Sequence, residues 1–541
     1  MRLLFRHIRL AQIALLAVIC LAACTHEDVF DAASNGYVGP AVEGESYFTL
    51  TLNLPAESTR ALPTGGEDGD GREDGTSVEN EIRDVWVYIL RHASGMDAPE
   101  GTPLLYTGFF NKDNAEEWTN LSDGVQMKFI VRDYLPEEGD RMIAVCNAGA
   151  SLPKPASLGE LRNLTAYSAW NRTDGTRFVM SSAYNDPDDG KISVTSKAGT
   201  KDDPFLGKLN IQRTAARIDL MYDRASNLSS SGEELIYKVY ADPDDPSSTV
   251  LGQMRLRHVI PVNLMQQSSY MIKRVTSSDD ITSPLKYGAR EATRADGTPT
   301  NYVVEPHTLV KNGSVSDDQL NAWYGNTRAK TIYTDPTTNL PTTSIDSYSG
   351  TETAKSGLGD NFTHVMTLAY TNENTQDKDH QSTNFITGLL LRAVYEPTKV
   401  YTDKDLTAEY SPMTDYASGH TFWRYSPTRT EMKEADCIYF SNLAAAEGYK
   451  AAHPSDMAEI TEFTDGICYY NVWLRHANVD RDPHLAFPME YGIVRNNIYR
   501  VGLNRVTGPG TPTSDLKAPD HLYLRIFVRE WNLREQPPIR L

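Results

Sequence analysis

Short apolar runs separated by turn-forming residues follow one another along most of the chain, and they predict strands rather than long helices. The first clear run alternates apolar with polar residues and has its apolar positions at Phe48, Leu50, Leu52 and Leu54. A period of two places these side chains on one face, so the segment is predicted to be a half-buried strand. Pro55 ends the run because proline lacks the N–H that a sheet ladder needs.

Further strand patterns follow in the first half of the chain. They span residues 85–90, 125–131, 142–145, 178–180 and 209–220, and only residues 156–170 look helical. In the last of these runs the apolar face switches midway, which predicts a β-bulge. Together the patterns fit one β-sandwich of about seven strands.

A second domain is expected to begin near Glu234. Its predicted strands span residues 235–240, 385–395, 437–440, 467–474 and 494–503, and residues 441–459 are predicted to form a short helix. Residues 270–380 are rich in Ser, Thr, Asp and Asn and have weak periodicity. They are therefore interpreted as long surface excursions.

The last strand pattern has the same spacing as the first. Its apolar positions are Leu522, Leu524, Ile526 and Val528, and Tyr523, Arg525, Phe527 and Arg529 alternate with them. Trp531 breaks the alternation, which predicts a bulge or bend near Arg529–Glu530. Any two half-buried strands share this period, so the spacing leaves open whether both segments are ordinary edge strands of their own domains.

The N-terminal segment reads as an export signal. A basic stretch precedes an apolar run over residues 13–21, which is too short for a comfortable membrane span. The following Leu21-Ala22-Ala23-Cys24 resembles the lipobox of bacterial lipoproteins. A lipobox implies cleavage before Cys24 and a diacylglycerol on its thiol, whereas the alternative is an ordinary secretory signal with an incidental cysteine. Residues 25–45 are interpreted as a flexible acidic tether.

Composition narrows the class of protein. A chain of 541 residues is expected to hold two or more domains, and a net charge of −20 argues against binding nucleic acid. Cys20 and Cys24 belong to the signal and the lipobox, and the other cysteines make no zinc pattern. Cys437 and Cys468 either pair or stay as buried free thiols, and their apolar strand patterns favour free thiols.

No enzyme signature is present. The sequence lacks a Walker loop, a dinucleotide fingerprint, a nucleophile elbow and a helical His pair for zinc. The acidic clusters at 186–189 and 242–245 flank prolines in turn-like segments, so they are interpreted as solvated loops rather than paired glycosidase carboxylates. Residues 65–75 lack the ligand spacing of a calcium loop. We therefore expect a non-enzyme without catalytic residues, metal or cofactor.

An ordered set of segments carries a family resemblance. Its members are residues 209–217, 387–397, 466–474 and 492–499, the terminal Val528-Arg-Glu-Trp531, the lipobox, and the Arg60 that follows the first strand. In this order they resemble the fimbrillins of type V pili, closest to the shaft subunit of the minor (Mfa-type) fimbria. Each segment alone is a weak signal, and residues 270–380 match nothing in that family.

The resemblance implies an all-β fold with two transthyretin-like β-sandwich domains in tandem, long loops and a few short helices. The implied divisions are a signal peptide (1–23), a lipidated propeptide with the first strand (24–60), an N-terminal domain (61–228) and a C-terminal domain (229–541).

The resemblance further implies a lipoprotein carried to the outer membrane and the cell surface. There an arginine-specific (gingipain-like) protease would cleave between Arg60 and Ala61 and remove the first strand. The gap would accept the terminal strand of another copy, with Leu522, Leu524, Ile526, Val528 and Trp531 as the donor residues. The product would be a homopolymer that assembles with anchor and tip subunits into an adhesive fimbria.

Elementary energetics agree with this mechanism. Deleting residues 46–60 would leave an apolar groove and unpaired backbone groups on both neighbouring strands, and an added strand would fill the groove by β-augmentation. Four buried aliphatic side chains contribute roughly 6–12 kcal/mol before ordering costs. The alternatives are an anchor subunit, a tip subunit, or a surface glycan-binding lipoprotein. The last would need exposed aromatic platforms, for which Tyr270, Trp323, Tyr324 and Trp423 are the candidates.

Overall fold

The computed structural model describes most of the chain. The described residues are 44–54, 75–92, 94–121, 124–166, 178–183, 188–195, 197–222, 235–267, 269–289, 291–292, 299–336, 353–354, 362–414, 420–429, 432–476, 488–514 and 522–530, with only the strand pairing given for 353–354 and 522–530. Cys24, Arg60, Ala61 and Trp531 lie outside these ranges, so the predictions made for them stay predictions.

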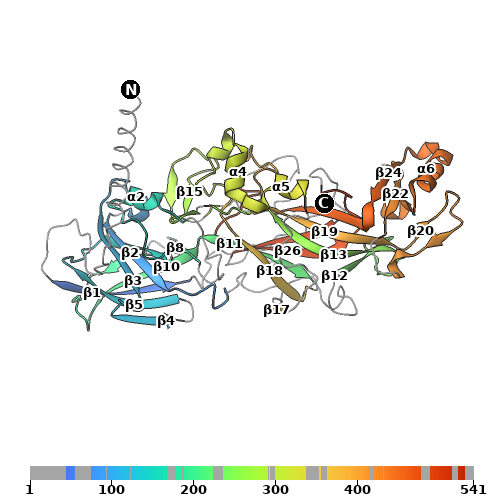
Figure 1. Ribbon diagram of the computed structural model, residues 1–541. Coiled ribbons are helices and arrows are strands. Elements are labelled where there is room, and N and C mark those ends of the chain that lie inside the picture. The colour runs from blue at the N-terminus through green and yellow to red at the C-terminus, as the bar shows by residue number, and fades with distance from the viewer. Residues whose placement is uncertain are drawn as a thin grey trace, which may run out of the picture.

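The expected all-β class is confirmed, since strands dominate and the helices are few and short. The first half forms β1 (Glu45–Asn53), β2 (Asp84–Arg91), β3 (Leu104–Asn111), β4 (Glu117–Leu121), β5 (Gly124–Arg132), β6 (Asp140–Cys146), α2 (Leu158–Asn163), β7 (Thr165–Ala166), β8 (Met180–Ser182), β9 (Ile192–Ser193) and β10 (Phe205–Arg213). These elements lie at one end of an elongated molecule (Figure 1).

The second half continues to the other end. It forms β11 (Ala215–Tyr222), β12 (Leu235–Tyr240), β13 (Val250–Val262), β14 (Ser269–Tyr270), β15 (Arg274–Thr276), β16 (Leu285–Tyr287), α4 (Asp317–Tyr324), α5 (Ala329–Thr334), β17 (Thr353–Ala354), β18 (His364–Asn372), β19 (Gly388–Pro397), β20 (Val400–Tyr401), β21 (Glu409–Tyr410), β22 (Phe422–Ser426), β23 (Ile438–Phe440), α6 (Leu443–Ala452), β24 (Glu459–Phe463), β25 (Ile467–Trp473), β26 (Asn497–Val506) and β27 (Leu522–Glu530). Short 3₁₀ turns occur at Gly95–Asp97, Val310–Asn312, Gly325–Thr327, Pro412–Thr414, Glu434–Asp436, Pro454–Asp456 and Thr464–Gly466.

The N-terminal sheet has the strand order β3-β2-β6-β8-β10-β1-β5-β4, with β9 paired to β10. Apolar side chains from β1 and β5 share one buried core with side chains from β2 and β6, so the sheet wraps around that core. The strand β1 is therefore an internal strand, although it comes first in the chain. This position excludes the alternative that residues 46–54 form an ordinary edge strand.

The run over residues 209–220 was predicted to contain a bulge, and the structure shows a change of sheet as well. Thr214 separates β10 from β11, and its backbone N–H and hydroxyl both donate to Val179 O, at 2.8 and 3.0 Å. Beyond Thr214 the strand joins a different sheet, and its register with β18 shifts between Ile218 and Asp219. The sheet change thus precedes the predicted domain boundary at residue 228, which itself stays a prediction.

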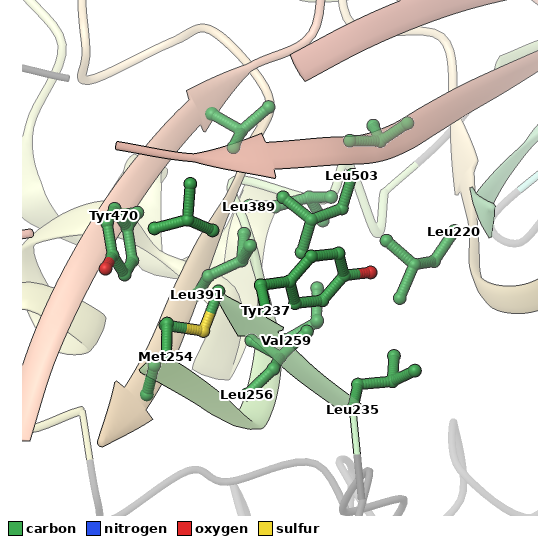
Figure 2. Close-up of a cluster of buried hydrophobic side chains, with 14 of the residues drawn as sticks. Leu220, Leu235, Tyr237, Met254, Leu256, Val259, Leu389, Leu391, Tyr470 and Leu503 are labelled. Carbon is green, nitrogen blue, oxygen red and sulfur yellow. The ribbon is translucent and has the colours of Figure 1, made fainter. Parts of the chain in front are cut away.

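The second core lies between two sheets of the C-terminal half. One has the order β17-β18-β11-β26-β27 and the other β12-β13-β19-β25. Figure 2 shows side chains from both meeting in one cluster, with Leu220 and Leu503 from the first sheet opposite Tyr237, Leu391 and their neighbours from the second. The packing of two sheets across a shared apolar layer is the arrangement of a β-sandwich.

A smaller sheet with the order β21-β20-β23-β22-β24 carries α6 at the end of the molecule remote from β1 (Figure 1). The helix confirms the prediction made for residues 441–459. It begins at the Asn442 cap, whose side-chain oxygen accepts from the N–H of Ala445 at 2.8 Å. Its alanines pack on Tyr425 and Phe440 of the sheet.

The interpretation of residues 270–380 as surface excursions is wrong for much of the described part. Val275, Tyr302 and Val303 form one buried cluster, and Leu320, Trp323 and Tyr324 belong to another. Polar residues dominate this stretch, and short apolar groups spread over several turns give no periodic signal. The burial therefore became visible only from the tertiary structure.

A buried ionic network joins the two halves. Arg217 on β11 binds both carboxylate oxygens of Glu79, at 3.0 and 3.1 Å, and also binds Asp219 at 2.9 Å. Arg500 on β26 donates to Asp219 at 3.1 Å, and the Tyr370 hydroxyl donates to Glu79 at 2.8 Å. Glu79 precedes β2, so the network holds the segment that follows the first strand against the second core.

Candidate assembly site

Both edges of β1 are hydrogen-bonded along their length. It pairs in parallel with β10 from Phe48↔Phe205 to Asn53↔Asn210, and antiparallel with β5 from Glu45↔Arg132 to Asn53↔Gly124. Removal of β1 would therefore leave two facing strand edges with unpaired N–H and C=O groups. Such a slot takes any strand of matching length and apolar spacing.

The inner face of β1 is fully enclosed. Phe48, Leu50 and Leu52 are 0% exposed and Leu54 is 7% exposed, as the alternation predicted. The role of these residues as a displaced strand stays a prediction.

The Phe48 side chain packs among three aromatic rings. Its ring centroid lies 5.6 Å from that of Phe129, 5.3 Å from that of Phe205 and 6.3 Å from that of Tyr134. These three aromatic walls of the slot were not recognised from the sequence as site residues. The only available signal was the alternation that places Phe129 on the inner face of β5.

The backbones of β1 and β5 approach each other closely at the C-terminal end of β1. Gly124 has φ +155, and a Cβ built there would lie 1.9 Å from Leu52 O. Only glycine allows β5 to start directly against the end of β1.

A cluster of polar side chains lies at the N-terminal end of β1. The Ser46 hydroxyl donates to Tyr134 O at 2.8 Å, and the Tyr134 hydroxyl donates to the buried Asp140 carboxylate at 2.5 Å. Burial and this carboxylate both raise the pKa of Tyr134, so its hydroxyl stays protonated and donating. Arg91 binds the same carboxylate at 2.6 Å and also pairs with Glu137 at 2.8 Å. These ion pairs hold the Arg91 side chain at the end of β2.

The outer face of β1 borders a polar groove of about 600 Å³. Thr49 and Thr51 contribute to its lining, together with Gln126 on β5 and Lys208 on β10. Gln126 Nε2 donates to the Thr51 hydroxyl at 3.1 Å. Each face of the strand thus has a distinct environment, apolar inside and polar outside.

The terminal strand β27 pairs antiparallel with β26 at the edge of the second sheet. Its ladder runs regularly through Arg529 and Glu530, and the register shifts instead between Leu503 and Arg505 of β26. The prediction of a bulge or bend at Arg529–Glu530 is therefore wrong. The β1 slot and β27 belong to different sheets of the same chain.

The aromatic residues considered for a glycan platform do not form one. Trp323 is 3% exposed and Tyr324 is 0% exposed, because both belong to a buried cluster around α4. The Tyr270 ring has the Arg274 guanidinium 3.5 Å from its centroid, and the half-buried Trp423 packs under α6. These four positions therefore supply no exposed aromatic platform.

The three described cysteines are free. Cys146 and Cys468 are buried and Cys437 is half-buried, which agrees with the interpretation as thiols. Burial raises the pKa of Cys437 and of Cys468 to about 11, so neither is a reactive thiolate at neutral pH.

Within the described residues, no helix is long and apolar enough to cross a membrane.

Comparison with known proteins places a family signature at the C-terminus. Residues 461–537 match the family model described as "Major fimbrial subunit protein type IV, Fimbrillin, C-terminal". The matched stretch contains β25, β26 and β27, which include three of the segments that carry the resemblance, whereas residues 209–217 and 387–397 lie outside it. No curated protein matches the sequence.

Solved structures give weaker likenesses. A putative cell adhesion protein from Bacteroides eggerthii has 11% identity and a TM-score of 0.34, with 91% of this chain and 98% of that chain covered. A fimbrial assembly protein from Parabacteroides distasonis has 12% identity and a TM-score of 0.24, with 48% and 85% covered. The fimbrial anchor protein Mfa2 from Porphyromonas gingivalis has 9% identity and a TM-score of 0.17, with 42% and 70% covered.

Proposed function

We propose that this chain is a structural subunit of a cell-surface fimbria that polymerises by donor-strand exchange. In the proposed route it is exported as a lipoprotein on Cys24, is cleaved between Arg60 and Ala61, and loses β1. The terminal strand of another copy then occupies the slot between β5 and β10. The observation that carries the proposal is the internal position of β1, whose loss would open a slot bounded by two strand edges. The fimbrillin match at residues 461–537 supports the same class of protein.

The free energy of side-chain burial disfavours an empty slot, and it allows one strand to be exchanged for another. Four nearly fully buried side chains contribute on the order of 6–12 kcal/mol, which is comparable with the whole stability of a typical domain. An empty slot is therefore strongly disfavoured, and the subunit stays closed while β1 is covalently attached. Cleavage breaks the covalent link that holds β1 at the slot, so β1 then loses its intramolecular advantage over the donor strand of another subunit.

Glu79 and Arg83, which precede β2, are anchored by contacts that do not involve β1. Glu79 is 2% exposed and is held by Arg217 and Tyr370, and its backbone O accepts from Arg213 Nε at 3.0 Å. Arg83 N–H donates to the Asn147 side chain at 2.8 Å. Loss of β1 would therefore leave these contacts at the start of β2 in place.

The role of Arg60 is tested with two arginine variants in the same stretch of chain. Arg60→Ala should leave lipidated monomers, whereas Arg72→Ala should be processed and should polymerise like the unmodified protein. N-terminal sequencing of surface-extracted protein should read from Ala61, and electron microscopy reports fibres. Fibres from the Arg60→Ala protein would show that strand removal at this bond is not the trigger.

A further inference from the structure

The polar groove on the outer face of β1 has a composition that depends on which strand occupies the slot. Thr49 and Thr51 are its only lining residues from β1. The other polar lining comes from segments that stay in place, among them Gln126 on β5 and Lys208 and Asn210 on β10. Exchange of β1 for another strand would therefore change part of the lining and keep the rest.

The charged walls of the groove are balanced. Lys191 pairs with Asp188, and Asn210 Nδ2 donates to Asp189 at 2.9 Å. Lys208 adds a second cation from β10. Two lysines thus face two aspartates, and the groove of the precursor offers no excess charge to a charged ligand.

The sequence of the terminal strand fixes what would enter the groove. With Leu522, Leu524, Ile526 and Val528 at the four buried positions 48, 50, 52 and 54, the residue at position 51 is Arg525. This holds for either strand direction, because 51 is the midpoint of 48–54 and 525 is the midpoint of 522–528. Position 49 receives Tyr523 in the direction of β1 and Phe527 in the opposite direction, so it becomes aromatic in both cases.

We propose that strand exchange converts this groove into a binding site for an acidic carbohydrate that exists only in the polymer. The inference rests on the proposed function, and the second copy of the chain contributes two lining residues. Its arginine gives the groove an excess positive charge and a planar, multidentate donor for a carboxylate or sulfate. Its aromatic ring supplies an apolar face for a sugar ring, next to the amides of Gln126 and Asn210. A groove of about 600 Å³ has room for a short oligosaccharide.

Binding is compared between the full-length precursor and fibres whose assembly is first verified by electron microscopy. The probes are sialyllactose and a hyaluronan tetrasaccharide, with lactose as the neutral control, and affinity is measured by titration. At least one acidic probe should bind fibres about tenfold more tightly than lactose does, and the precursor should bind none of them. Absence of fibres from cleaved protein would overturn the proposed function itself. Equal binding by precursor and fibres, or no acidic probe bound by verified fibres, would overturn this site alone.

Substitutions inside and outside the groove test where the acidic probe binds. Arg525→Gln in fibres should weaken the acidic probe about tenfold or more, the loss expected for one charge-assisted hydrogen bond. Arg132→Gln lies on the outer face of β5 outside the groove and should leave affinity unchanged. If the Arg525→Gln protein forms no fibres, Lys208→Gln takes its place, because Lys208 lines the groove without being part of the donor. Affinity unchanged by the variant used would overturn the proposal.

Discussion

Phe48 separates the stability of the precursor from that of the polymer. Its ring is 0% exposed and lies within 6.3 Å, between centroids, of Phe129, Phe205 and Tyr134. Phe48→Ala removes this ring from a close-packed site and should lower the free energy of unfolding of the precursor by about 3–5 kcal/mol. Urea denaturation of the precursor, followed by tryptophan fluorescence, measures the loss.

The thermal stability of the polymer should be unaffected by the same substitution. The proposed maturation removes residue 48, so fibres grown from Phe48→Ala protein should dissociate on heating at the same temperature as unmodified fibres. The matched control is Phe205→Ala on β10, which alters the wall of the slot and should weaken both the precursor and the fibres. Fibres that are weakened by Phe48→Ala as much as by Phe205→Ala would mean that β1 stays in the assembled subunit, and the strand-exchange mechanism would be wrong.

Three further predictions address other parts of the structure. Gly124→Ala places a Cβ 1.9 Å from Leu52 O, so it should separate β5 from β1 and lower the urea midpoint of the precursor. Glu79→Gln removes one of the two carboxylates that pair with Arg217, so Asp219 is left as its charged partner, and it should cost about 1.5–3 kcal/mol in the same assay; an effect below 1 kcal/mol would contradict the assigned role of the network. Burial alone raises the pKa of Glu79, but Arg217 and its hydrogen bonds lower it below 4.5 overall, so the carboxylate stabilises the fold above pH 4.5. That contribution should fade as pH falls below 4.5, and the Glu79→Gln protein should lack this part of the acid dependence. Deletion of residues 520–541 should leave a folded monomer by circular dichroism that forms no fibres, and fibres from this truncated protein would exclude β27 as the donor.

The sequence alone determined which face of a strand is buried and where a helix forms, because both depend on neighbouring residues. The alternation at Phe48, Leu50 and Leu52 specifies which face of β1 is buried, because a strand has a side-chain period of two. The position of α6 follows from an alanine-rich stretch behind an asparagine cap. Neither prediction needs knowledge of what the element packs against.

The partners of each strand were decided only by the tertiary structure. Alternation is the same for an edge strand and an internal one, so nothing local placed β1 between β5 and β10 or gave it a parallel neighbour. The change of sheet at Thr214 was read as a bulge, because both break the apolar period in the same way.

The buried chemistry of the slot and of the junction is equally non-local. Glu79 looks like one more solvated carboxylate in an acidic stretch until Arg217 and Tyr370 are brought to it from distant strands. Trp323 and Tyr324 were candidates for an exposed platform, yet they are core residues because segments around α4 fold over them. A sequence states which side chains prefer burial or charge pairing, whereas chain topology decides which distant groups meet and satisfy that preference.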